Sequence, residues 1–146
     1  MTRTIFFDMD GTIADLYNVE GWLDDLTNER VRPYKEAKAL VNLSTLARVL
    51  NKLQDKGYRI EVISWLSKNG TDNYNKKTEK AKRDWLNKHL HSVRFDAINI
   101  VKYGTAKQSF IHTTEDILFD DEVNNRTAWT GKAYDVNNIL EVLKNL

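Results

Sequence analysis

The chain has 146 residues, of which 41% are hydrophobic and 29% are charged, and its formal net charge is +1. A chain of this length suits one domain and buries roughly 68 to 70% of its unfolded surface, which is enough for a core of its own. The small net charge argues against bulk electrostatic capture of nucleic acid or of an anionic membrane. The sequence contains no cysteine, which excludes disulfides and thiolate chemistry.

The first four residues lead directly into an apolar stretch and leave no room for a secretory signal peptide. No apolar run approaches the ~18 residues that a membrane-spanning helix needs. A cytoplasmic protein is therefore expected. With no internal repeat and no linker of biased composition, residues 1–146 are predicted to form a single domain.

The first half of the chain predicts a strand, a loop and a helix in that order. Residues 3–8 are predicted to form a buried strand around the apolar run Ile5-Phe6-Phe7, and Gly11 follows it as a turn residue. Residues 13–35 are weakly periodic and predict a long loop that could hold a short helix. From Glu36 to Lys56, apolar residues including Leu40 recur with helical spacing, and Gly57 follows where a left-handed cap would end the helix.

The second half predicts strands that alternate with helices. Residues 58–64 alternate and then become apolar, which predicts a second strand ending at Ser64. A helix is expected over 75–90, a strand over 97–101, a short helix capped by Thr105 and reaching about His112, and a strand over 116–119. The last strand is expected at either 127–129 or 132–134, and Asp135 is expected to cap a C-terminal helix.

This alternation predicts an α/β fold, a three-layer, doubly wound and mainly parallel sheet with helices on both faces. In such folds, ligands bind beyond the carboxyl ends of the strands, near the point where the strand order reverses. Three polar side chains fall at those predicted ends: Asp8, Ser64 and Asp120. They are the first candidates for a functional site.

Four segments resemble the motifs of the haloacid dehalogenase superfamily, most of whose members are magnesium-dependent phosphohydrolases. The opening motif is matched by Asp8-Met9-Asp10-Gly11-Thr12, the second by Ile63-Ser64, the third by Lys107 or Lys102, and the fourth by Leu118-Phe119-Asp120-Asp121. Their order agrees with that of the superfamily, and they span residues 4–121. The ending Phe119-Asp120-Asp121 and the segments 77–79 and 85–89 are most similar to small 5'(3')-deoxyribonucleotidases.

The resemblance implies a two-step reaction. Asp8 would attack phosphorus and form an aspartyl phosphate, which divides one slow displacement into two easier ones. Asp10 would protonate the leaving oxygen and then deprotonate the water that hydrolyses the intermediate. Because an unperturbed aspartic acid has a pKa of ~3.9, the surroundings of Asp10 must raise its pKa for it to act as an acid at neutral pH.

A divalent cation is expected between the carboxylates. At about 4 Å and an effective dielectric near 20, each ionised pair would repel by roughly 4 kcal/mol. All-oxygen ligation with room for water and phosphate favours Mg²⁺. The ligands implied by the resemblance are the Asp8 carboxylate, the Asp10 backbone carbonyl and Asp120, with Asp121 helping directly or through water.

Phosphate binding is the remaining implied role. Ser64 and the backbone N–H groups near Met9, Asp10 and Gly11 would hold phosphate oxygens. Lys107 would neutralise charge as the phosphoryl group moves, and Lys102 is its main competitor.

The sequence lacks an insertion of domain size after either of the first two motifs. Residues 13–35 stand in place of a cap, so the site is expected to be open, or covered only by this segment or by another subunit.

The leading substrate is a nucleoside monophosphate. A phosphorylated macromolecule, either a nucleic-acid end or a phosphoprotein, is the alternative substrate. A phosphorylation-dependent receiver domain and a catalytically idle interaction module remain as alternatives to a phosphatase, and an Asp10-Gly11 hairpin turn is the alternative to a site at this position.

The basic run Lys76, Lys77, Lys80, Lys82, Arg83 is interpreted as a solvated helix face rather than a nucleic-acid surface. Two (i, i+4) pairs support this interpretation, namely Glu79 with Arg83 and Asp84 with Lys88. Trp65 is equally suited to stack on a nucleobase and to pack inside the protein.

Overall fold

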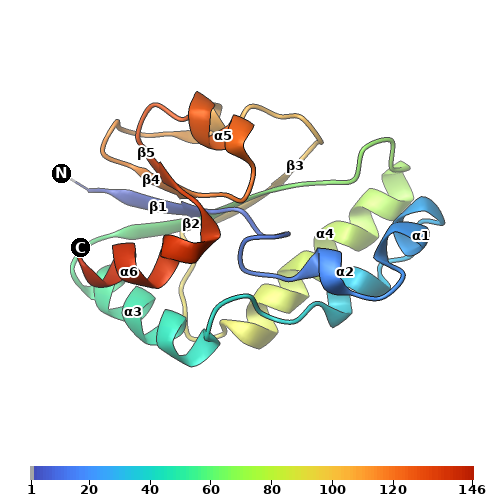
Figure 1. The fold of residues 1–146 in the computed structure, drawn as a ribbon, viewed down its shortest axis with the longest axis horizontal. Coiled ribbons are helices and arrows are strands. Elements are labelled where there is room, and N and C mark those ends of the chain that lie inside the picture. The colour runs from blue at the N-terminus through green and yellow to red at the C-terminus, as the bar shows by residue number, and fades with distance from the viewer. Residues whose placement is uncertain (1) are drawn as a thin grey trace.

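The computed structural model describes residues 2–146, and its framework is a five-stranded sheet in the order β3-β2-β1-β4-β5 (Figure 1). The strands are β1 (Thr4–Phe7), β2 (Arg59–Trp65), β3 (Ala97–Val101), β4 (Ile117–Phe119) and β5 (Lys132–Tyr134). Every neighbouring pair is parallel. The predicted α/β fold class is confirmed. A hairpin after β1 is excluded, because both neighbours of this central strand run parallel to it.

The helices lie mainly between the strands in sequence. They are α1 (Trp22–Thr27), α2 (Arg32–Glu36), α3 (Leu43–Asp55), α4 (Asp72–His89), α5 (Val123–Ala128) and α6 (Ile139–Lys144), with short 3-10 turns η1 (Leu16–Asn18), η2 (Lys107–Phe110) and η3 (Val136–Asn138). None of the helices within residues 2–146 is both long and apolar enough to cross a lipid bilayer.

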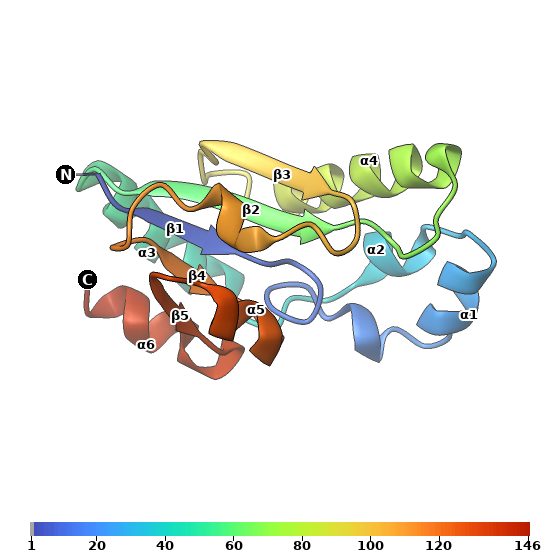
Figure 2. The same cartoon turned by 90° about the horizontal axis from the view of Figure 1, so that it is seen from above.

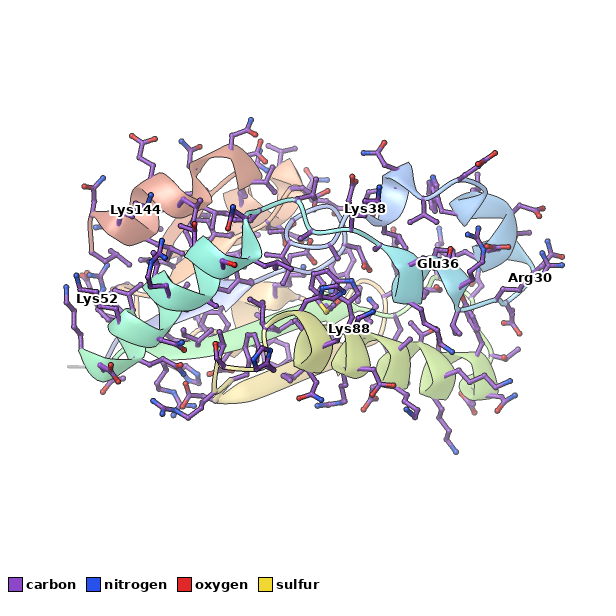
Figure 3. All side chains as sticks on the ribbon, turned by 90° about the horizontal axis from the view of Figure 1, so that it is seen from below. Arg30, Glu36, Lys38, Lys52, Lys88 and Lys144 are labelled. Carbon is purple, nitrogen blue, oxygen red and sulfur yellow. The ribbon has the colours of Figure 1, made fainter. Side chains whose placement is uncertain are left out.

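The two faces of the sheet are covered unequally. Ile5 and Phe7 point into the larger core, which α3, α4 and α6 cover, whereas Phe6 points into a smaller core with Trp129. Figures 1 and 2 show these three helices on one side of the sheet and α5 with the η2 segment on the other. Charged side chains such as Lys52 on α3 and Lys144 on α6 lie on the outer surface of this covering layer (Figure 3).

The predicted start of the third helix at Glu36 is wrong. Glu36 ends α2, and α3 begins only at Leu43, where the Asn42 side chain accepts a hydrogen bond from the N–H of Thr45. The intervening segment is kept out of a helical conformation by two backbone hydrogen bonds to residues 13–15. The Asp15 N–H donates to the Lys38 carbonyl, and the Leu40 N–H donates to the Ile13 carbonyl. Long-range pairing therefore replaces the helical hydrogen bonds that the spacing of Leu40 predicted.

Other boundaries also differ from the predictions. Lys107–Phe110 is a 3-10 turn that Thr105 does not cap, because the Thr105 hydroxyl donates to the Lys102 carbonyl instead. Residues 127–129 form no strand: α5 ends at Ala128, and the last strand is β5. Asp135 caps η3, which leads directly into α6.

Candidate active site

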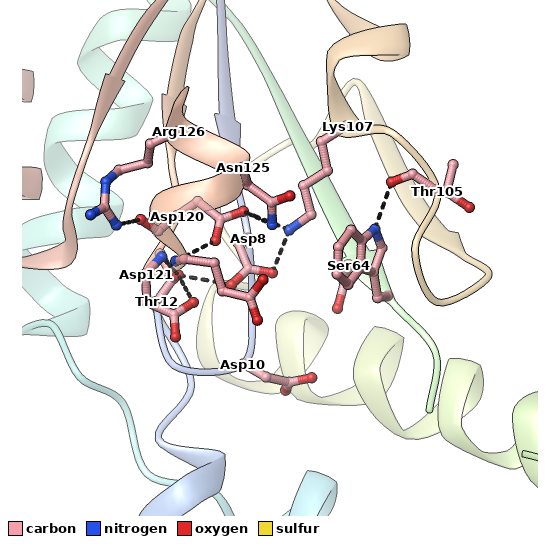
Figure 4. A network of polar contacts seen from close by, with 12 residues as sticks. Asp8, Asp10, Thr12, Ser64, Thr105, Lys107, Asp120, Asp121, Asn125 and Arg126 are labelled. Carbon is pink, nitrogen blue, oxygen red and sulfur yellow. Dashed lines mark hydrogen bonds and ion pairs between the residues drawn. The ribbon is translucent and has the colours of Figure 1, made fainter. Parts of the chain in front are cut away.

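Three carboxylates converge where β1 and β4 end. The two strands are paired with Phe7 opposite Phe119, so the next residues, Asp8 and Asp120, emerge side by side. Oxygen atoms of Asp8, Asp120 and Asp121 all lie within 4.8 Å of one another (Figure 4). Asp120 is fully buried and Asp8 is 7% exposed. The parallel register, rather than a local turn, therefore creates this acidic cluster.

Lys107 lies inside the cluster. Its Nζ is 2.8 Å from Asp8 Oδ1 and 2.7 Å from Asp120 Oδ2, and its side chain is buried. Lys102, the competing candidate, is exposed. Burial, the largest effect, lowers the pKa of Lys107, but Asp8 and Asp120 together outweigh it and raise the pKa. Lys107 is therefore a permanent cation that bridges β1 and β4.

The loop after β1 packs tightly against the loop after β4. The Thr12 hydroxyl lies 2.9 Å from Asp8 Oδ2, and it accepts a hydrogen bond from the Asp121 N–H at 3.2 Å. Gly11 has a left-handed φ of +82°, and a Cβ there would collide with the Asp121 carboxylate and with Tyr17. Glycine is thus required both by the backbone conformation and by the space.

The cluster carries more negative than positive charge. Three carboxylates face the single ammonium of Lys107, which leaves two negative charges when all are ionised. Burial, followed by repulsion from Asp8, raises the pKa of Asp121 to about 8 and also raises the pKa of Asp120. The raised values are the response expected of acids held together in a poorly solvated place.

This arrangement fits a divalent cation. The donors are all carboxylate oxygens, which suit a hard cation such as Mg²⁺, and two positive charges would balance the excess negative charge. Asp120 is already oriented by other groups, since it accepts hydrogen bonds from the Glu122 N–H and from Asn125. The residues that would hold the ion are thus fixed by their neighbours.

Asp10 stands apart from the other three carboxylates. It is paired with Lys82, whose Nζ lies 2.9 Å from Asp10 Oδ2, 2.7 Å from Ser64 Oγ and 2.7 Å from the Trp65 carbonyl. Burial raises the pKa of Asp10, and Lys82 opposes this rise without cancelling it. Asp10 and Lys82 thus form a second charged group, on the α4 side of the first.

The interpretation of Lys82 as part of a solvated face is wrong. Its side chain is 1% exposed, whereas Lys76, Lys77 and Lys80 are exposed. The signal was present in the spacing, because Lys82 lies four residues from both Thr78 and Leu86, which are buried on α4. A lysine in the middle of an apolar helical face is the pattern that could have revealed it.

The environment of Ser64 also differs from the expectation. β2 continues to Trp65, so Ser64 is still within the sheet, opposite Ile100, and is fully buried. Its hydroxyl faces Lys82, and the cavity described below is lined by the next four residues of the chain instead. The Gly11 N–H, predicted to hold phosphate, donates to the Ala14 carbonyl within the loop. Met9, another predicted phosphate ligand, is buried.

A cavity of about 500 Å³ opens above the carboxylates. Its floor contains Asp8, Asp10, Lys107, Asp120 and Asp121, and residues of the 13–35 segment form one wall: Leu16, Tyr17, Trp22, Leu23, Leu26, Thr27 and Tyr34. Trp65 and Tyr103 stand on another wall as an edge-to-face pair, with centroids 5.1 Å apart. Trp65 is anchored by a hydrogen bond from its Nε1 to the Thr105 carbonyl.

Of the two predicted ion pairs on α4, one is present. Arg83 Nε lies 3.1 Å from Glu79 Oε2. Asp84, however, pairs with Lys80 at 2.6 Å rather than with Lys88. Both pairs are exposed and contribute little to stability.

The sequence matches no model of a known protein family and no curated protein. The structure is similar to solved structures of two D,D-heptose 1,7-bisphosphate phosphatases. That from Burkholderia thailandensis is 18% identical, with a TM-score of 0.52 over 86% of this chain and 70% of that one. That from B. bronchiseptica, complexed with magnesium and phosphate, is 11% identical, with a TM-score of 0.57 over 98% of each chain. These comparisons show that the chain shares the fold of these enzymes.

Proposed function

We propose that this chain is a magnesium-dependent phosphatase of the haloacid dehalogenase type, which hydrolyses a phosphate monoester through an aspartyl phosphate. The observation that carries the proposal is the convergence of Asp8, Asp120, Asp121 and Lys107 at the floor of a cavity. The fold that it shares with two phosphatases, one of them complexed with magnesium and phosphate, supports the same chemistry.

Asp8 would be the nucleophile. One of its oxygens would form a bond to phosphorus while the bond between phosphorus and the ester oxygen breaks. Lys107 donates to Asp8 Oδ1 and the Thr12 hydroxyl donates to Asp8 Oδ2, so both oxygens of the nucleophile are oriented by neighbouring groups. Mg²⁺ bound by the three carboxylates would supply charge neutralisation for the phosphoryl group.

Asp10 would move the protons. In the first step it would give a proton to the departing ester oxygen, and in the second it would take one from the attacking water as the bond from Asp8 to phosphorus breaks. Its raised pKa agrees with a group that must be protonated at the start of the cycle. The starting state of Asp10 is thereby restored after each turnover.

The proposed substrate is a nucleoside monophosphate. The cavity has the size of ordinary small-molecule sites, and aromatic side chains on two walls, Tyr17 with Trp22 and Trp65 with Tyr103, could contact a base. Stacking of a base on an aromatic side chain is worth roughly 1 to 3 kcal/mol. The sequence likeness to small deoxyribonucleotidases points the same way. A sugar phosphate is the second candidate, because both structural neighbours are heptose bisphosphate phosphatases.

The test is phosphate release from p-nitrophenyl phosphate, nucleoside monophosphates and sugar phosphates, including D,D-heptose 1,7-bisphosphate, each with Mg²⁺ or with EDTA. We expect turnover that requires Mg²⁺, a higher kcat/KM for a nucleotide, and a loss of at least about 10³-fold in Asp8→Asn. The matched control is Asp55→Asn, an exposed residue at the end of α3, which should retain full activity. Full activity in Asp8→Asn would refute the nucleophile.

A further inference from the structure

Lys82 is a buried cation that takes no part in the reaction proposed above. Its three N–H groups meet three acceptors, on Asp10, Ser64 and the Trp65 backbone, so its hydrogen-bonding capacity is filled. Its Nζ also lies 5.1 Å from the centre of the Tyr34 ring. The side chain is therefore held in one place by groups from three other segments of the chain, namely the loop after β1, the end of β2, and α2.

Stability alone does not explain a lysine at this position. Moving an ammonium out of water costs several kcal/mol, and a buried ion pair is often no more stable than an apolar pair of the same shape. The neighbours of Lys82 on the same face of α4 include Trp85 and Leu86, which are apolar residues of the buried layer. A leucine or methionine would suit this layer. We therefore attribute the positive charge of Lys82 to a functional requirement of its partner, Asp10.

The geometry shows what the pairing does to Asp10. Asp10 is only two residues from Asp8, yet its carboxylate is not among the oxygens that gather with those of Asp120 and Asp121. Figure 4 shows the Asp10 side chain extending toward α4, away from the other three carboxylates. The ion pair with Lys82 opposes movement of this carboxylate into the acidic cluster, where it would become one more ligand of a cation.

We propose that Lys82 is a positioning residue that holds the Asp10 carboxylate out of the metal cluster and in the place where it exchanges protons with the leaving oxygen and with water. This role rests on the proposed phosphatase function. Through Ser64 and the Trp65 carbonyl, Lys82 also fixes the direction of Asp10 relative to the end of β2. Asp10 thus remains available for proton transfer because α4 supplies a fixed partner for it.

The experiment is a double-mutant cycle between Lys82→Met and Asp10→Asn, with kcat and KM measured on the best substrate of the panel. If Lys82 acts through Asp10, Lys82→Met lowers kcat on the order of 10²-fold, within the range of general acid–base catalysis, and changes KM by less than about 3-fold. In the Asp10→Asn background, Lys82→Met then causes no further loss. The matched control is Lys80→Met, an exposed lysine on the same helix, which keeps the wild-type kcat.

A second readout separates positioning from a general loss of structure. With p-nitrophenyl phosphate, whose leaving group needs little protonation, Lys82→Met should still form the aspartyl phosphate but hydrolyse it slowly. Mass spectrometry of quenched reactions should therefore show phosphorylated Asp8 accumulating in Lys82→Met but not in Lys80→Met. A variant damaged only in its folding would lose both steps together and would accumulate no phosphorylated protein.

Each outcome decides between the two proposals. A wild-type chain that releases no phosphate from any substrate refutes the phosphatase function and this role with it. An active wild type with Lys82→Met at full rate, or with equal losses from Lys82→Met in both backgrounds, refutes the role of Lys82 alone. If Lys82→Met does not fold, the double variant, which removes the buried charges together, is compared with Asp10→Asn, and a lower kcat in the double variant overturns the proposal.

Discussion

At the scale of single residues, Gly11 links the loop after β1 to the loop after β4. Its φ of +82° is unfavourable for alanine, and an added methyl group would meet the Asp121 carboxylate and the Tyr17 ring. We expect Gly11→Ala to lower stability by more than the roughly 1 to 2 kcal/mol of the backbone term alone. Displacement of Asp121 should also lower kcat by about 10²-fold.

The matched control for this substitution is Gly57→Ala. Gly57 also has a positive φ, +99°, but nothing lies within 4 Å of an added Cβ, so only the backbone term should appear. Urea denaturation measures both variants, and steady-state kinetics measures turnover. Equal losses of stability and activity in the two variants would contradict the importance of the contact with Asp121.

The sequence predicts some site residues better than others. Asp8 and Asp120 each follow an apolar strand, so the hydrophobic pattern alone predicts that they meet at one sheet edge. The burial of Lys82 could have been found from its helical spacing to Thr78 and Leu86, but its pairing with Asp10 could not, because that contact depends on how α4 packs against the sheet. The second strand was predicted to end at Ser64, whereas β2 ends one residue later, at Trp65. This difference leaves the Ser64 hydroxyl facing Lys82 rather than the cavity.

At the scale of elements, Asn42 defines the start of α3. Its side chain accepts a hydrogen bond from the Thr45 N–H at 3.0 Å, which satisfies one of the free donors of the first turn. We expect Asn42→Ala to lower the free energy of unfolding by about 0.5 to 2 kcal/mol and to leave kcat unchanged, since α3 does not line the cavity.

Ser44→Ala serves as the control, because Ser44 is exposed on the same helix. Chemical denaturation should separate the two variants by most of the cap energy. An effect of Asn42→Ala no larger than that of Ser44→Ala would show that the side chain does not cap the helix.

The elements that were predicted least well are those determined by distant contacts. The segment between α2 and α3 pairs with residues 13–15, and α5 is held partly by the hydrogen bond from Arg126 to the Asp120 carbonyl. Neither contact leaves a periodic signal in the sequence. The strands β1 to β4 were predicted to within a residue or two because apolar residues dominate each of them, and β1 and β4 are buried throughout.

At the scale of the whole molecule, the excess negative charge of the site should couple stability to pH and to Mg²⁺. Without metal, the surroundings of Asp121 raise its pKa from the ordinary 3.8 to about 8 in the folded chain. The folded chain therefore binds this proton more tightly than the unfolded chain does. This contribution to stability is present at low pH and is lost as pH rises from about 4 to 8.

Magnesium should reverse this trend. A protonated carboxylate is a poor metal ligand, so Mg²⁺ binds more tightly as Asp121 loses its proton. A ligand present at 100 times its Kd stabilises the folded state by about 2.7 kcal/mol. Thermal unfolding with Mg²⁺ or EDTA should therefore show a larger rise in Tm at pH 8.5 than at pH 6.5. In Asp121→Asn, the rise should lose most of its pH dependence; the same dependence in that variant would contradict the assignment.

The central position of β1 has a consequence for the order in which the chain is made. β1 is synthesised first, but its partners β2 and β4 end only at Trp65 and Phe119. At ribosomal rates of about 5 to 20 residues per second, β1 waits roughly 6 to 20 seconds for β4. During this interval an apolar strand destined for complete burial can pair at most with β2, along one of its two edges, so the protection of its other edge on the ribosome depends on what binds it in the meantime.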